Sequence, residues 1–208
     1  MNEELNAKLC AKYPKIFEHW KHMECMDGWY WLINNLCHSI QWRCDQEVRT
    51  YEEVLARNEM VQKLQSGDDS LFVTRYKGMN PEDVATCKAD YIATGIIKPV
   101  IPNQVYAAQV KEKFGGLRFY TGPASDGIHS IISFAEALSY HICEVCGTTV
   151  RVGRTEDGGI FTCCEDCCHK KWPERGWRFD AEEGSNDAIE ERGQELIKEL
   201  DETKGLTS

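Results

Sequence analysis

The hydrophobic positions of the chain follow a helical period over one long stretch. From Trp29 to about Cys44, apolar residues recur at intervals of three and four, which is the spacing of one face of a helix. This predicted inner face carries Trp29, Leu32, Ile33, Leu36 and Ile40. Asp27 precedes the run, and we expect it to be the N-cap of the helix.

The same period continues through the charged segment 45–66, which we predict to be a further amphipathic part of the helix. Its predicted inward residues are Val48, Tyr51, Leu55, Val61 and Leu64. A second stripe in the first half of the helix contains Trp31, Asn35, His38 and Trp42. Two tryptophans on this side indicate that the rest of the chain covers it or that a partner binds it. We expect the chain to cover it, and Trp31 and Trp42 are the apolar candidates for partner binding.

Shorter patterns predict the other elements. Helices are expected over Glu3–Lys12, from Pro81 onward and over 127–142, while the sequence at 71–76 favours a strand. Residues 96–100 are apolar but interrupted by proline, which predicts an edge strand or an extended loop. The predicted buried stripe of the helix at 127–142 consists of Ile128, Ile131, Ala135, Leu138 and Ile142.

The clearest hairpin signal lies at 104–122, where Gly115-Gly116 separates two β-prone runs. With these two glycines as the turn, Phe114 lies opposite Leu117. One predicted face of the hairpin carries Val110, Glu112, Phe114, Leu117 and Phe119. The other predicted face carries Gln109, Lys111, Lys113, Arg118 and Tyr120.

The second hairpin face has two interpretations. Lys111, Lys113, Arg118 and Tyr120 are candidate partner-binding residues, because cations with an aromatic ring suit contacts to phosphates and bases. The alternative is a solvated sheet face, on which Lys and Arg protect an edge from pairing. The acidity of the remaining chain favours this alternative.

Eleven cysteines stand among the 208 residues, an odd number that excludes complete intramolecular disulfide pairing. The N-terminal residues do not resemble a secretion signal, and no apolar run is long enough to span a membrane. We therefore expect a cytoplasmic protein in a reducing compartment, where clustered cysteines are more often metal ligands than disulfides.

The net charge of −10 excludes a general nucleic-acid binder that works by bulk attraction to phosphates. Residues 181–208 hold nine acidic and three basic residues, so this acidic tail supplies −6 and leaves −4 for residues 1–180. A local basic patch remains compatible with these numbers.

The strongest chemical signal is a pair of CxxC motifs. Cys143 and Cys146 form the first and Cys164 and Cys167 the second, with seventeen residues between the two motifs. This is the spacing of a four-cysteine structural zinc site, in which the closed thiolate shell leaves no position for a catalytic water. A hairpin is predicted between the motifs and a short helix after the second, which are the parts of a treble-clef zinc finger.

Neighbouring residues leave the ligand set open. Cys163 and Cys168 flank the second motif and His169 follows it, so that any of these three can replace a proposed ligand. We expect the set Cys143, Cys146, Cys164 and Cys167.

The segments DGWYWLINNLCHSIQ (27–41), QVKEKFGGLRFYTG (109–122) and CEVCG (143–147), with the later cysteine pair, resemble a family of small bacteriophage and prophage proteins. Members carry a KEKFGGLRFY-type hairpin followed by a zinc-ribbon-like or treble-clef segment. The resemblance covers roughly residues 14–172, with a poorly matching stretch at about 45–100. It implies a phage context, a bacterial host cytoplasm and a zinc site at the matched cysteines, but no general activity.

These observations predict an α+β fold in which N-terminal helices pack on a small antiparallel sheet, followed by a C-terminal treble-clef or zinc-ribbon-like module. The expected units are a helical and hairpin domain at 1–142 with a variable insertion at 45–100, the zinc module at 143–180 and the acidic tail at 181–208. The chain lacks a nucleotide-binding glycine loop, a Ser-His-Asp set and an HExxH motif, so we do not expect an enzyme.

The expected function is binding to a host protein, such as an antiviral defence protein, in order to inhibit or redirect it. Nucleic-acid binding through the basic hairpin face and the zinc module is the alternative. Neither alternative requires a membrane.

Overall fold

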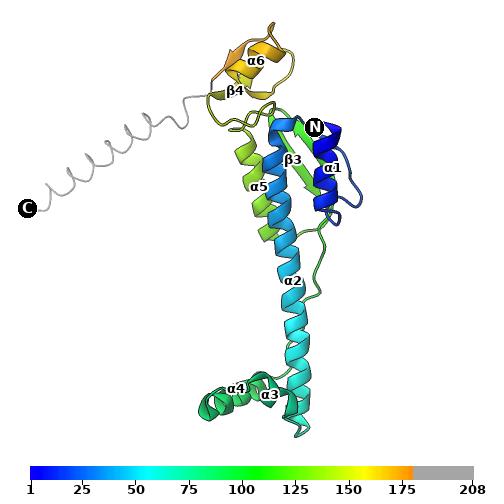
Figure 1. Cartoon of the computed structure of the whole chain (residues 1–208), viewed down its shortest axis with the longest axis vertical. Coiled ribbons are helices and arrows are strands. Elements are labelled where there is room, and N and C mark those ends of the chain that lie inside the picture. Colours follow the sequence, from blue (N-terminus) through cyan, green and yellow to red (C-terminus); the bar gives the residue numbers. More distant parts are fainter. Residues whose placement is uncertain (180–208) are drawn as a thin grey trace, which may run out of the picture.

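A single helix of 36 residues, α2 (Tyr30–Gln65), runs along most of the molecule (Figure 1). The structure is a computed structural model that describes residues 1–179, so the acidic tail lies outside the described residues. No glycine or proline interrupts residues 30–65, which explains why the helical pattern continues for about 54 Å. Gly67, with a φ of 88°, ends the helix in the left-handed conformation that favours glycine.

The remaining helices and strands are short. The helices are α1 (Glu3–Lys12), a 3-10 turn η1 (Asp27–Trp29), α3 (Ser70–Arg75), α4 (Pro81–Thr94), α5 (Asp126–Ser139) and α6 (Glu165–Lys171). The strands are β1 (Met23–Glu24), β2 (Ala107–Lys113), β3 (Gly116–Thr121), β4 (Val152–Thr155), β5 (Thr162–Cys164) and β6 (Trp177–Arg178). The predicted mixture of helices and small sheets is confirmed. None of the helices within residues 1–179 combines the length and the apolar character needed to cross a bilayer.

The N-terminal half of α2 packs as predicted. Ile33, Leu36 and Ile40 are buried in the main core, together with residues of α1, α5 and the first sheet. The expected N-cap role of Asp27 is wrong. Its carboxylate instead accepts hydrogen bonds from the backbone and side-chain nitrogens of Asn2, and a 3-10 turn leads into α2 at Tyr30.

The C-terminal half of α2 is covered on one side only. Val61 and Leu64 are buried as predicted, but Val48 and Leu55 are exposed, which corrects the prediction that they face inward. The reason is that α3 and α4 contact only the end of α2 and an extended segment runs beside this half, while the globular core stops above it (Figure 1). The Asn58 side chain binds both the N–H and the C=O of Ile97, so residues 96–100 form the extended loop rather than an edge strand.

The strand expected at 71–76 is wrong, because Ser70–Arg75 forms the helix α3. No strand of the described chain lies beside this segment to pair with it, and a helix satisfies its own backbone groups. Phe72 is buried there against the rings of Tyr76 and Tyr91. The helix predicted from Pro81 is confirmed as α4, and the Asn80 side chain caps it.

The first sheet has the order β1-β2-β3 and is mixed rather than antiparallel, because β1 pairs with β2 in parallel. The hairpin turn is Phe114-Gly115 and not Gly115-Gly116, since Lys113 pairs with Gly116. The pairing differs from the predicted register by two positions, so each residue stays on its predicted face. Phe114 is the exception, because it lies in the turn and is exposed.

Helix α5 covers the free edge of β3. The Ser139 hydroxyl accepts a 2.8 Å hydrogen bond from the Leu117 N–H, and a Glu136 carboxylate oxygen accepts one of 2.8 Å from the Phe119 N–H. The buried stripe of α5 is Ile128, Ile132, Ala135 and Ser139, so the prediction that Leu138 is buried is wrong. The covered edge cannot pair with another strand.

The second sheet has the order β5-β4-β6 and lies at the end of the molecule beyond α5 (Figure 1). The sequence between the two CxxC motifs predicts hairpin strands at residues 149–151 and 160–162. The hairpin is present, but its strands β4 and β5 begin three and two residues later. The short helix predicted after the second motif is confirmed as α6.

Candidate metal centre

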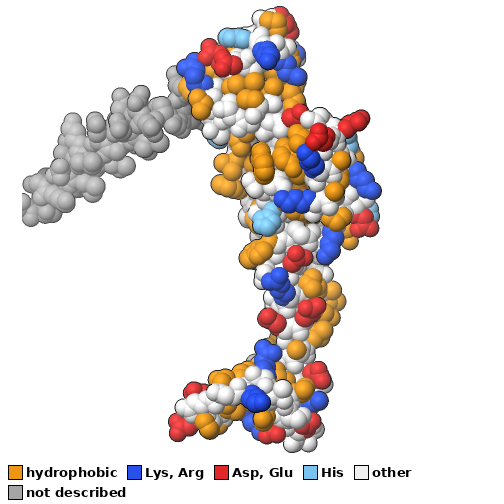
Figure 2. Space-filling view, in the orientation of Figure 1, with side chains coloured by type: hydrophobic (Ala, Val, Ile, Leu, Met, Phe, Trp, Pro, Cys, Tyr) orange, Lys and Arg blue, Asp and Glu red, His pale blue; other side chains and the backbone are white. Residues whose placement is uncertain are grey.

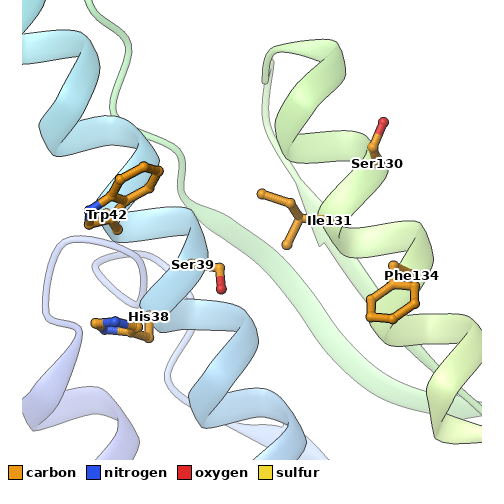
Figure 3. A pocket seen from close by; sticks show the side chains of 6 residues that line it. All are labelled: His38, Ser39, Trp42, Ser130, Ile131 and Phe134. Carbon is orange, nitrogen blue, oxygen red and sulfur yellow. The ribbon is translucent and has the colours of Figure 1, made fainter.

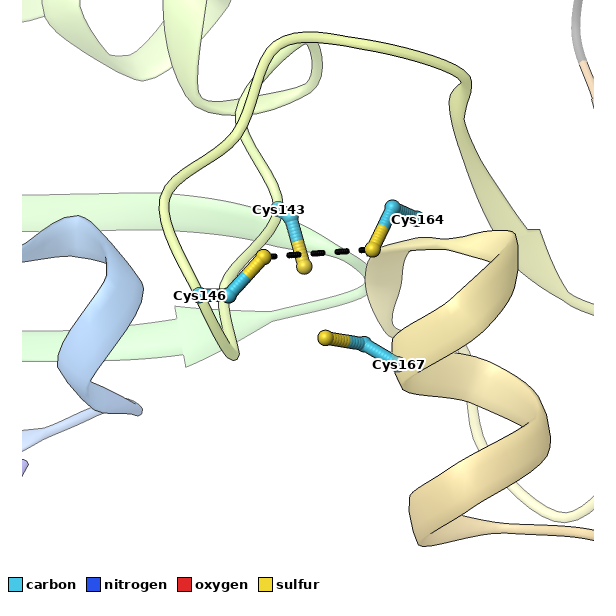
Figure 4. Close-up of side chains that lie close together, drawn as sticks. All are labelled: Cys143, Cys146, Cys164 and Cys167. Atoms are coloured by element: carbon cyan, nitrogen blue, oxygen red, sulfur yellow. Dashed lines mark hydrogen bonds between the residues drawn. The ribbon is translucent and has the colours of Figure 1, made fainter.

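The four cysteines of the two CxxC motifs lie together (Figure 4). The sulfur atoms of Cys143, Cys146, Cys164 and Cys167 are all within 4.8 Å of one another. The Sγ atoms of Cys146 and Cys164 are 3.8 Å apart. A tetrahedron with Zn–S bonds of about 2.3 Å has sulfur–sulfur edges of about 3.8 Å, so the cluster has the size of a four-thiolate site and can hold a metal ion.

Two structural elements supply the four thiols. Cys143 and Cys146 lie in a tight turn that is closed by a 2.8 Å hydrogen bond from the Gly147 N–H to the Cys143 carbonyl. Gly147 has a φ of 80°, which the turn requires and which glycine adopts without strain. Cys164 ends β5 and Cys167 lies in the first turn of α6, so strand and helix together fix the second pair.

The electrostatics of the cluster differ from one thiol to the next. Burial raises the pKa of Cys143, although the backbone N–H groups of Cys164, Cys146 and Val145 oppose this effect. For Cys146, burial is outweighed by hydrogen bonds from the Thr148 N–H and the neighbouring thiols, and the pKa is lowered. Burial raises the pKa of Cys167 above its ordinary value. A bound divalent cation favours thiolates and offsets the cost of burying them.

The alternative ligands do not belong to this group of sulfurs. Cys163 and Cys168 are buried beside the cluster, where they pack with Trp172 and Trp177. His169 lies on the exposed side of α6. Within residues 1–179, the four cysteines of the two CxxC motifs are the group that can hold an ion.

The turn of the first motif docks against the start of the long helix. The Gly28 N–H donates a 2.8 Å hydrogen bond to the Glu144 carbonyl, and the Trp29 indole N–H donates one of 2.9 Å to the Ile142 carbonyl. On the other side of the module, the Thr162 hydroxyl donates to the Gly115 carbonyl of the hairpin turn. These hydrogen bonds join the cysteine-bearing segment to the start of α2 on one side and to the β2–β3 hairpin on the other.

Glu144 is a buried carboxylic acid inside the first motif. Burial raises its pKa to about 7, against the opposing effect of the Met26 N–H, which donates to Oε1 at 2.9 Å. Oε2 has no hydrogen-bond partner among the described residues. Sequence reasoning did not single out Glu144 or Gly28. The sequence offered two signals. Glu144 is an acid between Cys143 and Cys146, and Gly28 is a glycine just before the predicted helix.

The six predicted partner-binding residues occupy two separate surfaces. Lys111, Lys113, Arg118 and Tyr120 share the hairpin face that points away from the core, as the register shows. Trp31 and Trp42 are exposed on α2, so the expectation that the chain covers this side is wrong. Trp42 lines a groove between α2 and α5, whereas Trp31 lies outside the groove lining.

Comparisons of the chain with protein-family models, with curated proteins and with solved structures found no match.

Proposed function

We propose that this chain is a phage-encoded, zinc-stabilised accessory protein that binds a protein of its bacterial host. Its action there is to inhibit or redirect that protein, and an antiviral defence protein is the target class we favour. The resemblance to phage and prophage proteins supports the context. The single observation that carries the binding role is an exposed aromatic groove between α2 and α5.

The groove runs between two helices that lie side by side and has a volume of about 640 Å³ (Figure 3). Trp42 on α2 and Phe134 on α5 form its two walls and are 56% and 65% exposed. Ser39 and Ile131 point into the space between the helices. Figure 2 shows hydrophobic side chains gathered over α5. Large aromatic side chains exposed together on one surface are typical of protein-binding sites.

A groove between two packed helices has the shape that accepts a third helix. An amphipathic helix inserts its apolar side chains between the two ridges and leaves its polar face in water. The groove lining also includes the polar residues His38 and Ser130, and Arg43 lies close to Gly127 at one end. We therefore propose that the host protein contributes an amphipathic helix, with polar or acidic residues beside its apolar stripe.

The zinc in this proposal is structural. The turn, the β4–β5 hairpin and α6 follow one another in the order of a treble-clef finger, and four thiolates leave no open coordination position. Such sites contribute ~10–16 kcal/mol of binding free energy in small peptides. Because the turn docks on Gly28 and Trp29, the ion would stabilise the end of α2 that precedes the groove.

The test is capture of bacterial proteins on the zinc-loaded chain, followed by reconstitution with the purified partner. A photo-crosslinking residue at Ser130 should react with one helical segment of the partner. The double variant Trp42→Ala and Phe134→Ala should lose the partner. The matched control Val73→Ala and Met79→Ala removes exposed apolar side chains far from the groove and should retain it.

Two results would overturn the proposal. One is a purified partner that binds the Trp42→Ala and Phe134→Ala variant as well as it binds the unchanged chain. The other is a crosslink from Ser130 that maps to no helical segment of the partner.

A further inference from the structure

The outer face of the first sheet combines cations and aromatic rings. Residues that pair across neighbouring strands point to the same face, so Lys111 lies between Arg118 of β3 and Glu24 of β1. Tyr120 pairs with Gln109 on the same face, and Lys113 pairs with Gly116. Helices α1, α2 and α5 pack against the opposite face. On this face Lys113 and Tyr120 are exposed, while Lys111 and Arg118 are half-buried.

The three cations of this face are not neutralised by ion pairs in the described part of the chain. Lys111, Lys113 and Arg118 form no ion pair within residues 1–179. Glu112 is turned to the other side of the hairpin, where its carboxylate accepts a 2.6 Å hydrogen bond from the Gly115 N–H. The nearby acids are Glu24, which the register places beside Lys111, and Glu136, which lies at the edge of β3 close to Arg118. The face is therefore basic although the chain as a whole is acidic.

Aromatic rings lie next to the cations. The ammonium of Lys111 is 5.7 Å from the Tyr120 ring, and Tyr120 is 42% exposed. Arg118 donates a 2.8 Å hydrogen bond to the Tyr140 hydroxyl and lies over that ring. Gly116 makes room for this ring, because a Cβ there would lie 2.5 Å from the Tyr140 hydroxyl oxygen.

The tip of the hairpin carries an unusual aromatic residue. Phe114 has a φ of 55°, in the left-handed region where a bulky side chain is rare and where this type of turn favours Asn or Gly. Its side chain is 67% exposed, so packing does not explain the choice of residue. The Lys113 ammonium lies 5.3 Å from the centre of this ring. Strained backbone conformations cluster at functional sites, so this turn is a candidate for one.

We propose that this face binds single-stranded nucleic acid. Phosphates contact Lys111, Lys113 and Arg118, while bases stack on Tyr120 and Phe114. Lys111 and Lys113 are two residues apart on one strand, about 7 Å along it, which suits successive phosphates of an extended chain. Exposed ring faces favour unpaired bases, because a duplex hides its bases in the stack. This site is separate from the groove and does not depend on the proposed protein partner.

The test is fluorescence anisotropy of a labelled oligo(dT) of about 12 nucleotides, and of the matching oligo(rU), with the zinc-loaded full chain. Three cations predict a slope of log K against log salt near −2, since each single-strand phosphate contact contributes about −0.7. The double variant Lys111→Ala and Lys113→Ala should reduce this slope by about 1.4. Tyr120→Ala should weaken binding at least about fivefold at constant salt.

Two control variants locate the site. Lys77→Ala removes an exposed cation at the far end of the molecule, and Phe134→Ala removes a wall of the groove. Both should bind the oligonucleotide like the unchanged chain. Folding of every variant is checked by its circular dichroism and zinc content.

The proposal is overturned if the unchanged chain shows no binding up to about 100 µM at about 50 mM salt. It is equally overturned if Lys77→Ala weakens binding as much as the hairpin variants do. Loss of a captured protein partner in the hairpin variants, with oligonucleotide binding unchanged, would assign the face to a protein instead.

Discussion

The backbone N–H of Gly28 donates a 2.8 Å hydrogen bond to the carbonyl oxygen of Glu144, 116 positions further along the chain. This contact joins the start of the long helix to the turn that carries Cys143 and Cys146. A side chain at position 28 would have no room, because a Cβ there would lie 2.5 Å from the Gly147 nitrogen and 2.6 Å from the Glu144 carbonyl oxygen. The cysteines form a hydrophobic cluster of their own, and this close backbone contact joins that cluster to the main core.

The first prediction concerns this close approach. Gly28→Ala should lower the free energy of unfolding by at least about 2 kcal/mol, because backbone on both sides must move to admit the methyl group. It should also lower the affinity for zinc, since the moved backbone carries two of the thiols. Denaturant titration and competition with a chelator measure the two effects. Gly122→Ala is the matched control, because nothing lies within 4 Å of a Cβ at that position. Equal stability of the two variants would contradict the packing argument.

The second prediction concerns metal removal. Chelation or Cys164→Ser should abolish zinc binding and expose Trp172 and Trp177, which pack beside the buried cysteines. Their fluorescence should shift to longer wavelength. The far-ultraviolet circular dichroism should change little, because most helical residues belong to the separate core around α2. Cys87→Ser, a change outside the cluster, should keep the full zinc content. If Cys164→Ser left the zinc content unchanged, Cys164 would not be a required ligand and the assignment of four cysteine ligands would be wrong.

The structure could be predicted correctly from the sequence where a pattern of neighbouring residues determines it. The helical period predicted the buried face of the N-terminal half of α2, and the doubled CxxC spacing predicted which four cysteines meet. The faces of the hairpin were also predicted, because the error in its register was two positions and side chains alternate with a period of two.

The predictions that were wrong depend on contacts between residues far apart in the sequence. Such contacts are either missing where the local pattern implies burial or present where it gives no sign of them. Val48 and Leu55 have helical spacing, but too few distant residues pack on them to bury them. The segment 71–76 has strand composition without an adjacent strand to pair with. Gly28 and Glu144 meet across more than a hundred residues, and local pattern carries no information about such a contact.

The third prediction concerns the hairpin turn. Phe114→Asn should raise the free energy of unfolding by about 0.5–1 kcal/mol, because asparagine tolerates the left-handed conformation better than phenylalanine. The same change should weaken oligonucleotide binding if Phe114 is a stacking residue. Gly115→Ala, at a φ of 79°, should lower stability instead. Thermal unfolding distinguishes the two variants, and a Phe114→Asn chain no more stable than the unchanged one would contradict the strain argument.

The last prediction concerns the pH dependence of stability. Burial raises the pKa of Glu144 from 4.5 to about 7. Between these values the folded chain holds a proton that the unfolded chain releases, so the free energy of unfolding falls as the pH rises. From about pH 6 to about pH 8, the loss from this one group should be about 1.4 kcal/mol.

Glu144→Gln should remove this loss, because the amide is neutral throughout and its oxygen can still accept the hydrogen bond from the Met26 N–H. The variant should therefore gain stability relative to the unchanged chain as the pH rises. Denaturant titrations of the zinc-loaded proteins at several pH values measure the difference, and thiolate titration cancels between the two proteins. Glu53→Gln, on the exposed surface of α2, reports the effect of removing a charge alone. Parallel curves for the unchanged chain and Glu144→Gln would mean that the carboxyl group is ionised in the folded state across this whole range.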